Sequence, residues 1–180
     1  IDFGISHITR GEDHVSNTAM HVQMFEALDA TPPKMAHLPL ISDMAGGKLS
    51  KRLGSLAVES LRDDEGIEPM AIISLLARLG TSDPIEANND MQTFIKTFDF
   101  TKFGRGTPKM DLTEIERLNA RIVHNLPYAD VADRPELNGV DENFWNNVRA
   151  NLTKVSDVQN WKHVTDDKIQ ISVADDDKDY

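Results

Sequence analysis

Apolar residues recur every three or four positions along much of this 180-residue chain, which is the spacing that collects them on one face of a helix. The pattern predicts helices over residues 16–31, 55–61, 69–79, 111–126, 141–152 and 155–164. Ser16 can cap the first of these helices, and the pair Pro32-Pro33 stops it. Gly80 follows the third helix as its stop.

The later helices begin at acidic residues and contain both tryptophans. Asp111 and Glu114 have the spacing of a capping box, and Asp141 is a second acidic cap. Trp145 and Trp161 fall among the apolar positions of the last two helices. We therefore expect both to be core anchors; the alternative is a pair of platforms for stacking nucleic-acid bases.

Two short segments have the pattern of β-strands. Residues 1–10 alternate loosely between apolar and polar positions, and residues 36–41 form a compact apolar run. Residues 81–89 and 103–109 are rich in glycine, proline and small polar residues, which predicts loops. The predicted fold is mainly α with a small α/β part.

Composition narrows the function classes. A hydrophobic content of 39% is enough for one sizeable core or two small ones. The net charge of -11 argues against a protein that coats nucleic acid nonspecifically, although an acidic body can carry a local basic groove. Without cysteine the chain has no disulfide and no thiolate metal site, and no apolar run is long enough to span a membrane. We expect a soluble, cytoplasmic protein.

Both ends of the chain fall where an element would be expected to continue. Ile1 lies within a predicted strand, and the last six residues, Asp-Asp-Asp-Lys-Asp-Tyr, contain no helix stop. We therefore expect an internal piece of a longer protein.

The lysine loop, residues 46–52, has the composition of a polyphosphate-binding loop: Gly-Gly-Lys-Leu-Ser-Lys-Arg. Its glycines let the backbone approach a ligand closely. Lys48 and Lys51 supply mobile positive charges, and Ser50 adds a hydroxyl that can bond a phosphate oxygen. The same residues also fit an exposed turn with solvated lysines, so the surrounding sequence must decide.

A second candidate site directly follows the first predicted strand. Residues 10–14, Arg-Gly-Glu-Asp-His, place four polar or ionisable groups around one glycine. Ligands of α/β proteins bind at the carboxyl ends of the strands, so the position suits a binding site; a charged surface loop is the alternative. His21 on the next helix fits a surface or packed histidine.

Several other kinds of site are excluded by missing motifs. The six histidines are scattered, without a zinc-type spacing, so we expect no structural metal. Neither a Walker phosphate loop nor a Gly-x-Ser-x-Gly nucleophile elbow occurs. Any phosphate chemistry is therefore expected at the lysine loop.

Three motifs in order carry a family resemblance. They are Ile-Thr-Arg-Gly-Glu-Asp-His-Val-Ser-Asn-Thr at residues 8–18, Pro33 with Ala-His-Leu-Pro-Leu-Ile at 36–41, and Lys-Leu-Ser-Lys-Arg-Leu-Gly-Ser at 48–55. Together they closely resemble the bacterial glutamyl-tRNA synthetases, which are class I aminoacyl-tRNA synthetases. Lys-Leu-Ser-Lys-Arg resembles the class I signature loop of that family. The likeness covers nearly the whole chain and weakens beyond about residue 125.

The resemblance implies a division into three parts. Residues 1–52 resemble the C-terminal part of a Rossmann-type catalytic domain, and residues 53–108 a helical stem-contact region. Residues 109–180 resemble the start of a helical anticodon-binding domain.

The resemblance also implies an activity, which is ATP-dependent attachment of glutamate to tRNA(Glu) through glutamyl-adenylate. By their places in the motifs, Lys51 and Lys48 are expected to act in catalysis, stabilising charge on the phosphates as pyrophosphate leaves. The residues expected to bind ATP are Lys48, Ser50, Lys51, Arg52 and His14. Mg2+ is expected to accompany ATP.

Glutamate recognition is implied for a different pair of residues. Arg10 matches the arginine that holds the amino-acid substrate in this family, and a planar guanidinium suits a carboxylate. Asp13 is expected beside it in the same pocket. The implied partners are tRNA(Glu), glutamate and ATP, with no membrane and a monomeric parent protein.

The sequence also departs from the family. The His-Ile-Gly-His type motif that helps bind ATP is absent from these residues. We therefore expect half of an active site and no aminoacylation by the chain alone.

Three alternatives remain at this point. They are a paralogue that glutamylates a modified base of tRNA(Asp), a glutaminyl enzyme, and a nonenzymatic tRNA-binding module. The helical pattern after residue 111 argues against the first two, because the paralogue lacks an anticodon domain and the glutaminyl enzyme has a β-barrel there.

Overall fold

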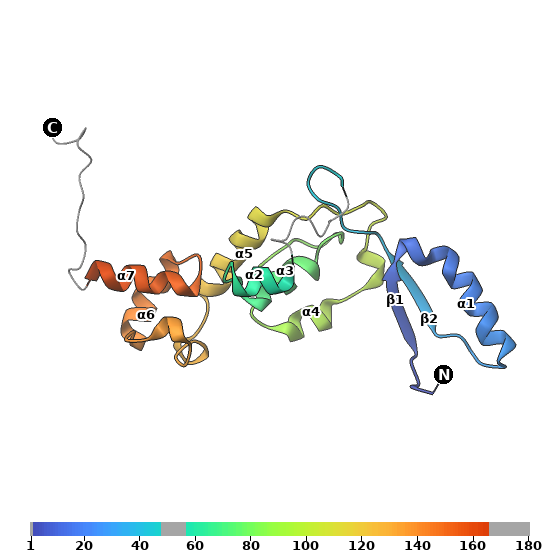
Figure 1. The fold of residues 1–180 in the computed structure, drawn as a ribbon, viewed down its shortest axis with the longest axis horizontal. Helices are drawn as coiled ribbons and strands as arrows, with labels where there is room; N and C mark the ends of the chain where they lie inside the picture. Colours follow the sequence, from blue (N-terminus) through green and yellow to red (C-terminus); the bar gives the residue numbers. More distant parts are fainter. Residues whose placement is uncertain (1, 48–56, 166–180) are drawn as a thin grey trace.

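The computed structural model describes residues 2–47 and 57–165, and the chain runs along the long axis of an elongated molecule (Figure 1). One end holds the strands and first helix, the middle holds α2 to α5, and α6 and α7 form the other end (Figure 1). The elements are β1 (His7–Gly11), α1 (Val15–Ala27), β2 (Lys34–Leu38), α2 (Val58–Asp63), α3 (Pro69–Leu76), α4 (Met91–Thr97), α5 (Leu112–His124), α6 (Glu142–Val148) and α7 (Val158–Thr165). The predicted class, mainly α with a small α/β part, is confirmed.

The strands β1 and β2 pair in parallel, and α1 forms the connection between them. The register pairs His7 with Lys34 and Arg10 with His37. β1 begins later than the sequence predicts. The pairing stops at Lys34 because Pro32-Pro33 precedes it, and proline offers no N–H to a ladder.

The start of α1 differs from the prediction. A single 3₁₀ turn over Glu12–His14 leads directly into the helix, so the N-cap position falls on His14 and the helix begins at Val15. Ser16 therefore lies inside the first turn, where its hydroxyl bonds Asn17 instead of capping. The predicted Ser16 cap is wrong, although α1 ends before the prolines as expected.

The middle group is held by one apolar cluster in which α3 packs on α5. Its buried members are Leu61, Ile67, Ala71, Ile72, Leu75, Ile115, Leu118 and Ile122. Pro69 occupies the first turn of α3, as predicted. The helix ends at Leu76 with Ala77 as its C-cap, so the predicted stop at Gly80 is wrong; this glycine, with a φ of 79°, lies in the turn that follows. Asp111 caps α5 through the amide of Thr113, but Glu114 does not complete a capping box because it accepts hydrogen bonds from Arg117 instead.

A second cluster forms the C-terminal group, with Trp145 fully buried at its centre. Asp141 caps α6 by accepting from the Phe144 amide, as predicted. Trp161 is 38% exposed, so its prediction as a core anchor is wrong. Val158 is the buried residue of α7, whereas Trp161 and Val164 are only partly covered by the described residues.

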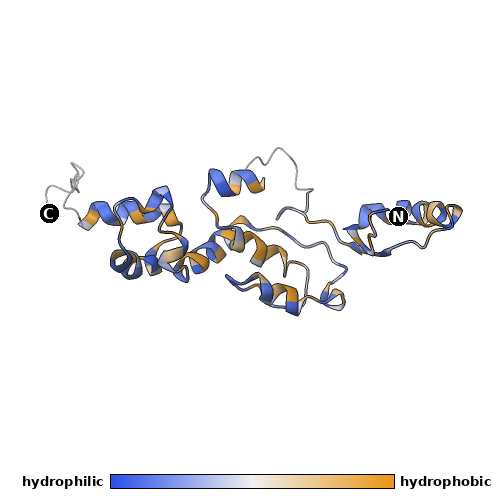
Figure 2. Ribbon diagram, turned by 90° about the horizontal axis from the view of Figure 1, so that it is seen from below, coloured by the Kyte–Doolittle hydropathy of each residue, from blue (hydrophilic) through white to orange (hydrophobic). Residues whose placement is uncertain are grey.

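The helices carry mixed polar and apolar residues (Figure 2), the colouring of amphipathic elements. Within residues 2–47 and 57–165, no helix combines the length and apolarity that crossing a membrane requires.

Candidate active site

A hollow of about 560 Å³ lies at the carboxyl ends of β1 and β2. Its lining comes from the two strand ends and the segments that follow them: Thr9, Arg10, Gly11, Asp13, Leu38, Pro39, Leu40 and Ile41. Adjacent parallel strands end together, so their following loops converge on one site. The structure thus brings Arg10 and Asp13 to the same hollow.

Arg10 is half-buried, and its guanidinium is held by groups from β2 and α1. Nη1 lies 3.1 Å from Nδ1 of His21, and Nη2 donates to Oγ1 of Thr18 and lies 3.6 Å from the sulfur of Met35. Nε is buried with no hydrogen-bond partner. No carboxylate of the described residues is among these contacts, so the charge of Arg10 is oriented but not neutralised.

The Thr18 hydroxyl is the centre of this polar cluster. It donates to the carbonyl of His14 at 3.1 Å, and it lies 2.8 Å from Nε2 of His37. A hydroxyl has one proton and two lone pairs, so with its proton on the His14 carbonyl it accepts from both Arg10 and His37. This count places a proton on Nε2 of His37 and leaves the hydroxyl fully satisfied.

Asp13 and His14 follow β1 in the 3₁₀ turn and are exposed. A Cβ at Gly11 would lie only 2.4 Å from Oδ1 of Asp13, so the turn can fold this carboxylate back only over a glycine. His14 contributes its backbone carbonyl to the Thr18 hydroxyl. Both side chains remain open to a ligand at the strand ends.

Lys48, Ser50, Lys51 and Arg52 lie outside the described residues. The start of the lysine loop is described and forms a closed turn with Asp43. The Gly47 amide donates to Oδ1 of Asp43 at 2.7 Å, and the Asp43 amide donates to the Gly47 carbonyl at 2.9 Å.

Both glycines of this turn are required by geometry. Gly46 has a φ of 88°, a conformation that strains other residues. A Cβ at Gly47 would lie 2.8 Å from Oδ2 of Asp43. The lysine loop therefore begins in a turn that the Asp43 side chain closes.

The base of the lysine loop is joined to a segment far away in sequence. The Ser42 amide donates to the Pro108 carbonyl at 3.0 Å, and the Met110 amide donates to the Ser42 carbonyl at 2.9 Å. Nζ of Lys109 also reaches the carbonyl of Met44 at 3.3 Å. This bridge ties the loop base to the residues immediately before the cap of α5.

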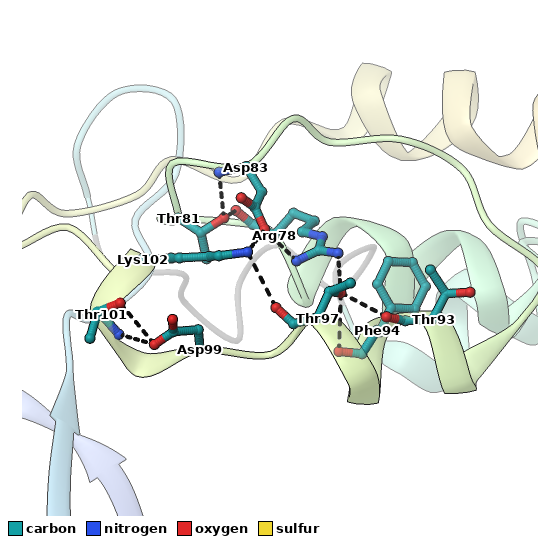
Figure 3. Close-up of polar contacts among 9 residues, drawn as sticks. All are labelled: Arg78, Thr81, Asp83, Thr93, Phe94, Thr97, Asp99, Thr101 and Lys102. Atoms are coloured by element: carbon teal, nitrogen blue, oxygen red, sulfur yellow. Dashed lines mark hydrogen bonds and ion pairs between the residues drawn. The ribbon is translucent and has the colours of Figure 1, made fainter.

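A separate charged network lies in the middle group (Figure 3). Oδ2 of Asp83 accepts from Arg78 at 2.6 Å and from Lys102 at 2.9 Å. Arg78 also donates to Thr97 and lies over the ring of Phe94, 5.5 Å from its centroid. The network joins the turn after α3, the helix α4, the 81–89 loop and the 3₁₀ turn at Lys102. Its two cations share the carboxylate of Asp83, which fits a structural role.

Sequence reasoning missed the parts of the site that depend on tertiary contacts. It treated His21 as an ordinary helix histidine and did not single out Thr18, His37 or Asp43. Asp43 did have a local signal, since an aspartate before a glycine pair commonly closes a turn. Among the described residues, no three histidine or acidic side chains gather where they could hold a metal ion.

Residues 1–117 match the family model described as tRNA synthetases class I (E and Q), catalytic domain. The chain belongs to this family. This class I synthetase chain is 47% identical to a protein named glutamate–tRNA ligase 1 from Rhizorhabdus wittichii, over all of the chain and 40% of that protein. It is 51% identical to glutamate–tRNA ligase 2 from Sphingopyxis alaskensis, over 92% of the chain and 37% of that protein.

Solved structures agree on the fold of the synthetase chain. The glutamate-tRNA synthetase of Elizabethkingia anophelis matches 88% of it with a TM-score of 0.68 and 25% identity, over 38% of that structure. A glutamate tRNA ligase of Elizabethkingia meningosepticum, solved with its amino acid, matches 89% with a TM-score of 0.71 and 24% identity, again over 38%. The chain therefore spans well under half the length of these relatives.

Proposed function

We propose that this chain is part of a glutamate–tRNA ligase that joins glutamate to tRNA(Glu) through glutamyl-adenylate, using ATP. The names of the relatives at 47% and 51% identity support glutamate as the substrate. The observation that carries the proposal is Arg10, which lines the strand-end hollow and whose guanidinium has no carboxylate partner among the described residues.

Arg10 is proposed to bind a carboxylate of glutamate. Burying a guanidinium without a counter-charge is costly, so the site favours an anionic ligand that supplies the missing charge. The fork of N–H donors matches the two oxygens of a carboxylate, and held in place by α1 it loses little freedom on binding. Asp13, exposed on the same hollow, is proposed to meet the cationic amino group of the substrate.

ATP is proposed to bind at the lysine loop. Lys51 and Lys48 would stabilise the charge that builds on the phosphates as pyrophosphate leaves, and Ser50, Arg52 and His14 would contribute to ATP binding. The described turn at Asp43 supports this assignment, because its hydrogen bonds to Gly46 and Gly47 close the base from which the lysine loop continues. Mg2+ would enter with the phosphates, neutralising part of their charge.

The three-part division stays part of the proposal: residues 1–52 in the catalytic domain, 53–108 in a stem-contact region, and 109–180 at the start of an anticodon-binding domain. In the structure α5 contributes to both apolar clusters. The parent ligase is proposed to act as a cytoplasmic monomer on tRNA(Glu), and this chain by itself is proposed to be inactive.

The test is steady-state pyrophosphate exchange by the full-length ligase, with ATP, glutamate and tRNA(Glu). Arg10→Gln removes the charge, and we expect the KM for glutamate to rise about 10- to 100-fold, since a hydrogen bond to a charged group contributes about 1.5–3 kcal/mol. The KM for ATP should change little. Lys51→Ala should instead lower kcat by about 100-fold.

Arg62→Gln is the matched control, because it removes an exposed arginine of α2 that pairs with Asp63. An unchanged glutamate KM in Arg10→Gln would remove Arg10 from the substrate site. If the full-length protein bound tRNA with a steep salt dependence but catalysed no ATP-dependent exchange, it would be a tRNA-binding module.

A further inference from the structure

The layer between α1 and the strands is unusually polar. In a parallel pair covered by its connecting helix, this layer is normally apolar. Here Arg10, Met35 and His37 of the strands meet Thr18 and His21 of α1. These polar residues therefore do more than pack α1 against the strands.

Within the part of the chain that the structure describes, the partners of Arg10 share one property, which is that none carries a negative charge. They are an imidazole nitrogen, a hydroxyl and a thioether. Acidic residues are not scarce, because the chain has 30 of them against 19 lysines and arginines. Asp13, three residues along the chain, is turned over Gly11 and forms no ion pair with Arg10.

Other arginines of the same chain are held differently. Arg134 forms a two-pronged pair with Glu68, and Arg78 pairs with Asp83. Hydrogen bonding to Glu68 raises the pKa of Arg134 above its usual value. These arginines are structural, and their charge is already used within the protein. Arg10 differs from them because its guanidinium is equally well oriented but no acidic side chain of the described residues pairs with its charge.

We propose that His21 and Thr18 are positioning residues that hold the Arg10 guanidinium by neutral acceptors, so that its charge stays available to the carboxylate of the amino-acid substrate. This rests on the proposed function of Arg10 as the glutamate-binding residue. Nδ1 of His21 accepts from Arg10 only when it carries no proton, which assigns the proton of the neutral ring to Nε2. A carboxylate at position 21 would orient Arg10 equally well but would compete with the substrate for its charge.

The decisive pair of variants is His21→Asn and His21→Asp. The two replacements have the same shape, and in both Oδ1 can stand where Nδ1 of histidine stood, so they differ chiefly in charge. His21→Leu removes the acceptor altogether. At the other contact, Thr18→Ser keeps the hydroxyl and Thr18→Val removes it.

The readout is the KM for glutamate in pyrophosphate exchange by the full-length ligase, with tRNA(Glu) present, together with kcat and the KM for ATP. We expect His21→Asn to stay within about 3-fold of the unsubstituted enzyme, His21→Leu to raise the glutamate KM about 10-fold, and His21→Asp to raise it about 50- to 100-fold. Both kcat at saturating glutamate and the KM for ATP should stay within about 3-fold. Thr18→Val should resemble His21→Leu, and Thr18→Ser should resemble the unsubstituted enzyme.

Two controls separate charge placement from instability. His7→Asn and His7→Asp make the same changes on β1 at an exposed histidine whose ring bonds Ser6, and neither should raise the glutamate KM. Thermal unfolding shows whether each variant folds. If His21→Asp does not fold, the Thr18→Val and Thr18→Ser pair decides.

The inference is overturned if His21→Asn and His21→Asp have the same glutamate KM, or if Thr18→Val matches Thr18→Ser. It is also overturned if kcat and both KM values fall or rise together, as loss of structure would cause. Arg10→Gln distinguishes failure of this inference from failure of the proposed function. A raised glutamate KM in Arg10→Gln with no effect at positions 18 and 21 refutes only the inference, whereas no effect in Arg10→Gln refutes the proposed substrate site itself.

Discussion

Asn119 is a buried polar residue that joins three separate segments, and replacing it by leucine should be strongly destabilising. It lies in α5 with 1% of its surface exposed. Its Oδ1 accepts from the Glu68 amide at 2.7 Å, at the start of α3, and its Nδ2 donates to the Thr153 carbonyl at 2.7 Å. Asn119→Leu keeps the approximate volume but leaves both backbone groups without partners.

Each unsatisfied buried group costs about 1–3 kcal/mol, and the added apolar contact offsets part of this, so we expect a net loss of about 2–4 kcal/mol in the free energy of unfolding. At this chain length the loss corresponds to a Tm lower by about 5–15 °C. Urea unfolding followed by circular dichroism measures the free energy, and calorimetry measures Tm. Because Thr153 lies near the surface, water can replace that one bond, which places the expected value toward the lower end of the range.

The matched control is Asn125→Ala, at the exposed end of the same helix, where the side chain bonds only the Arg121 carbonyl. We expect a change within about 0.5 kcal/mol there. A loss below about 1 kcal/mol in Asn119→Leu, or one equal to the Asn125→Ala value, would refute the reasoning that these two hydrogen bonds hold the segments together.

Two further predictions concern charged groups. Asp83→Asn weakens the contacts with Arg78 and Lys102 (Figure 3), and it should lower the free energy of unfolding by about 1–3 kcal/mol. A double-mutant cycle with Lys102→Met tests the direct pair, which complete additivity of the two free-energy changes would contradict. Partial burial acts to raise the pKa of Asp157, but hydrogen bonds from Thr153 and from the Lys154 amide outweigh this effect. The pKa of Asp157 in the folded protein therefore lies below its usual value. A lowered folded-state pKa stabilises the protein above the unfolded pKa of about 4, and this stability is lost as the pH falls through the folded value. The free energy of unfolding measured from pH 6 downward should therefore fall less steeply below about pH 4 in Asp157→Asn; parallel profiles would contradict the assignment.

Features set by neighbouring residues were predictable from the sequence. The caps at Asp111 and Asp141 depend only on a side chain and an amide two or three residues later, and both occur as predicted. The burial of Trp161 could not be predicted in the same way. Its helical spacing marks an apolar face, but burial depends on how completely other elements cover that face, and the described residues leave 38% of Trp161 exposed.

In the candidate site, too, features set by a local motif were predictable, whereas features set by tertiary packing were not. Arg10 was identifiable because it lies at the end of a predicted strand, in a recognisable motif. Its partners were not, since Thr18, His21 and Met35 lie 8, 11 and 25 positions away and meet it only once α1 packs against both strands. The roles proposed for Arg10, Asp13 and the lysine loop remain predictions, and the turn at Asp43 adds a described base for that loop.

The helix α5 has a geometric consequence for the whole molecule. With 13 residues at a rise of 1.5 Å each, it is about 20 Å long, and it connects the bridge at Ser42 to the apolar cluster of the C-terminal group. The helix therefore sets the distance between the Ser42 bridge and the C-terminal group, and it also sets their relative rotation about the helix axis. One residue inserted into α5 would rotate α6 and α7 by about 100° relative to the base of the lysine loop.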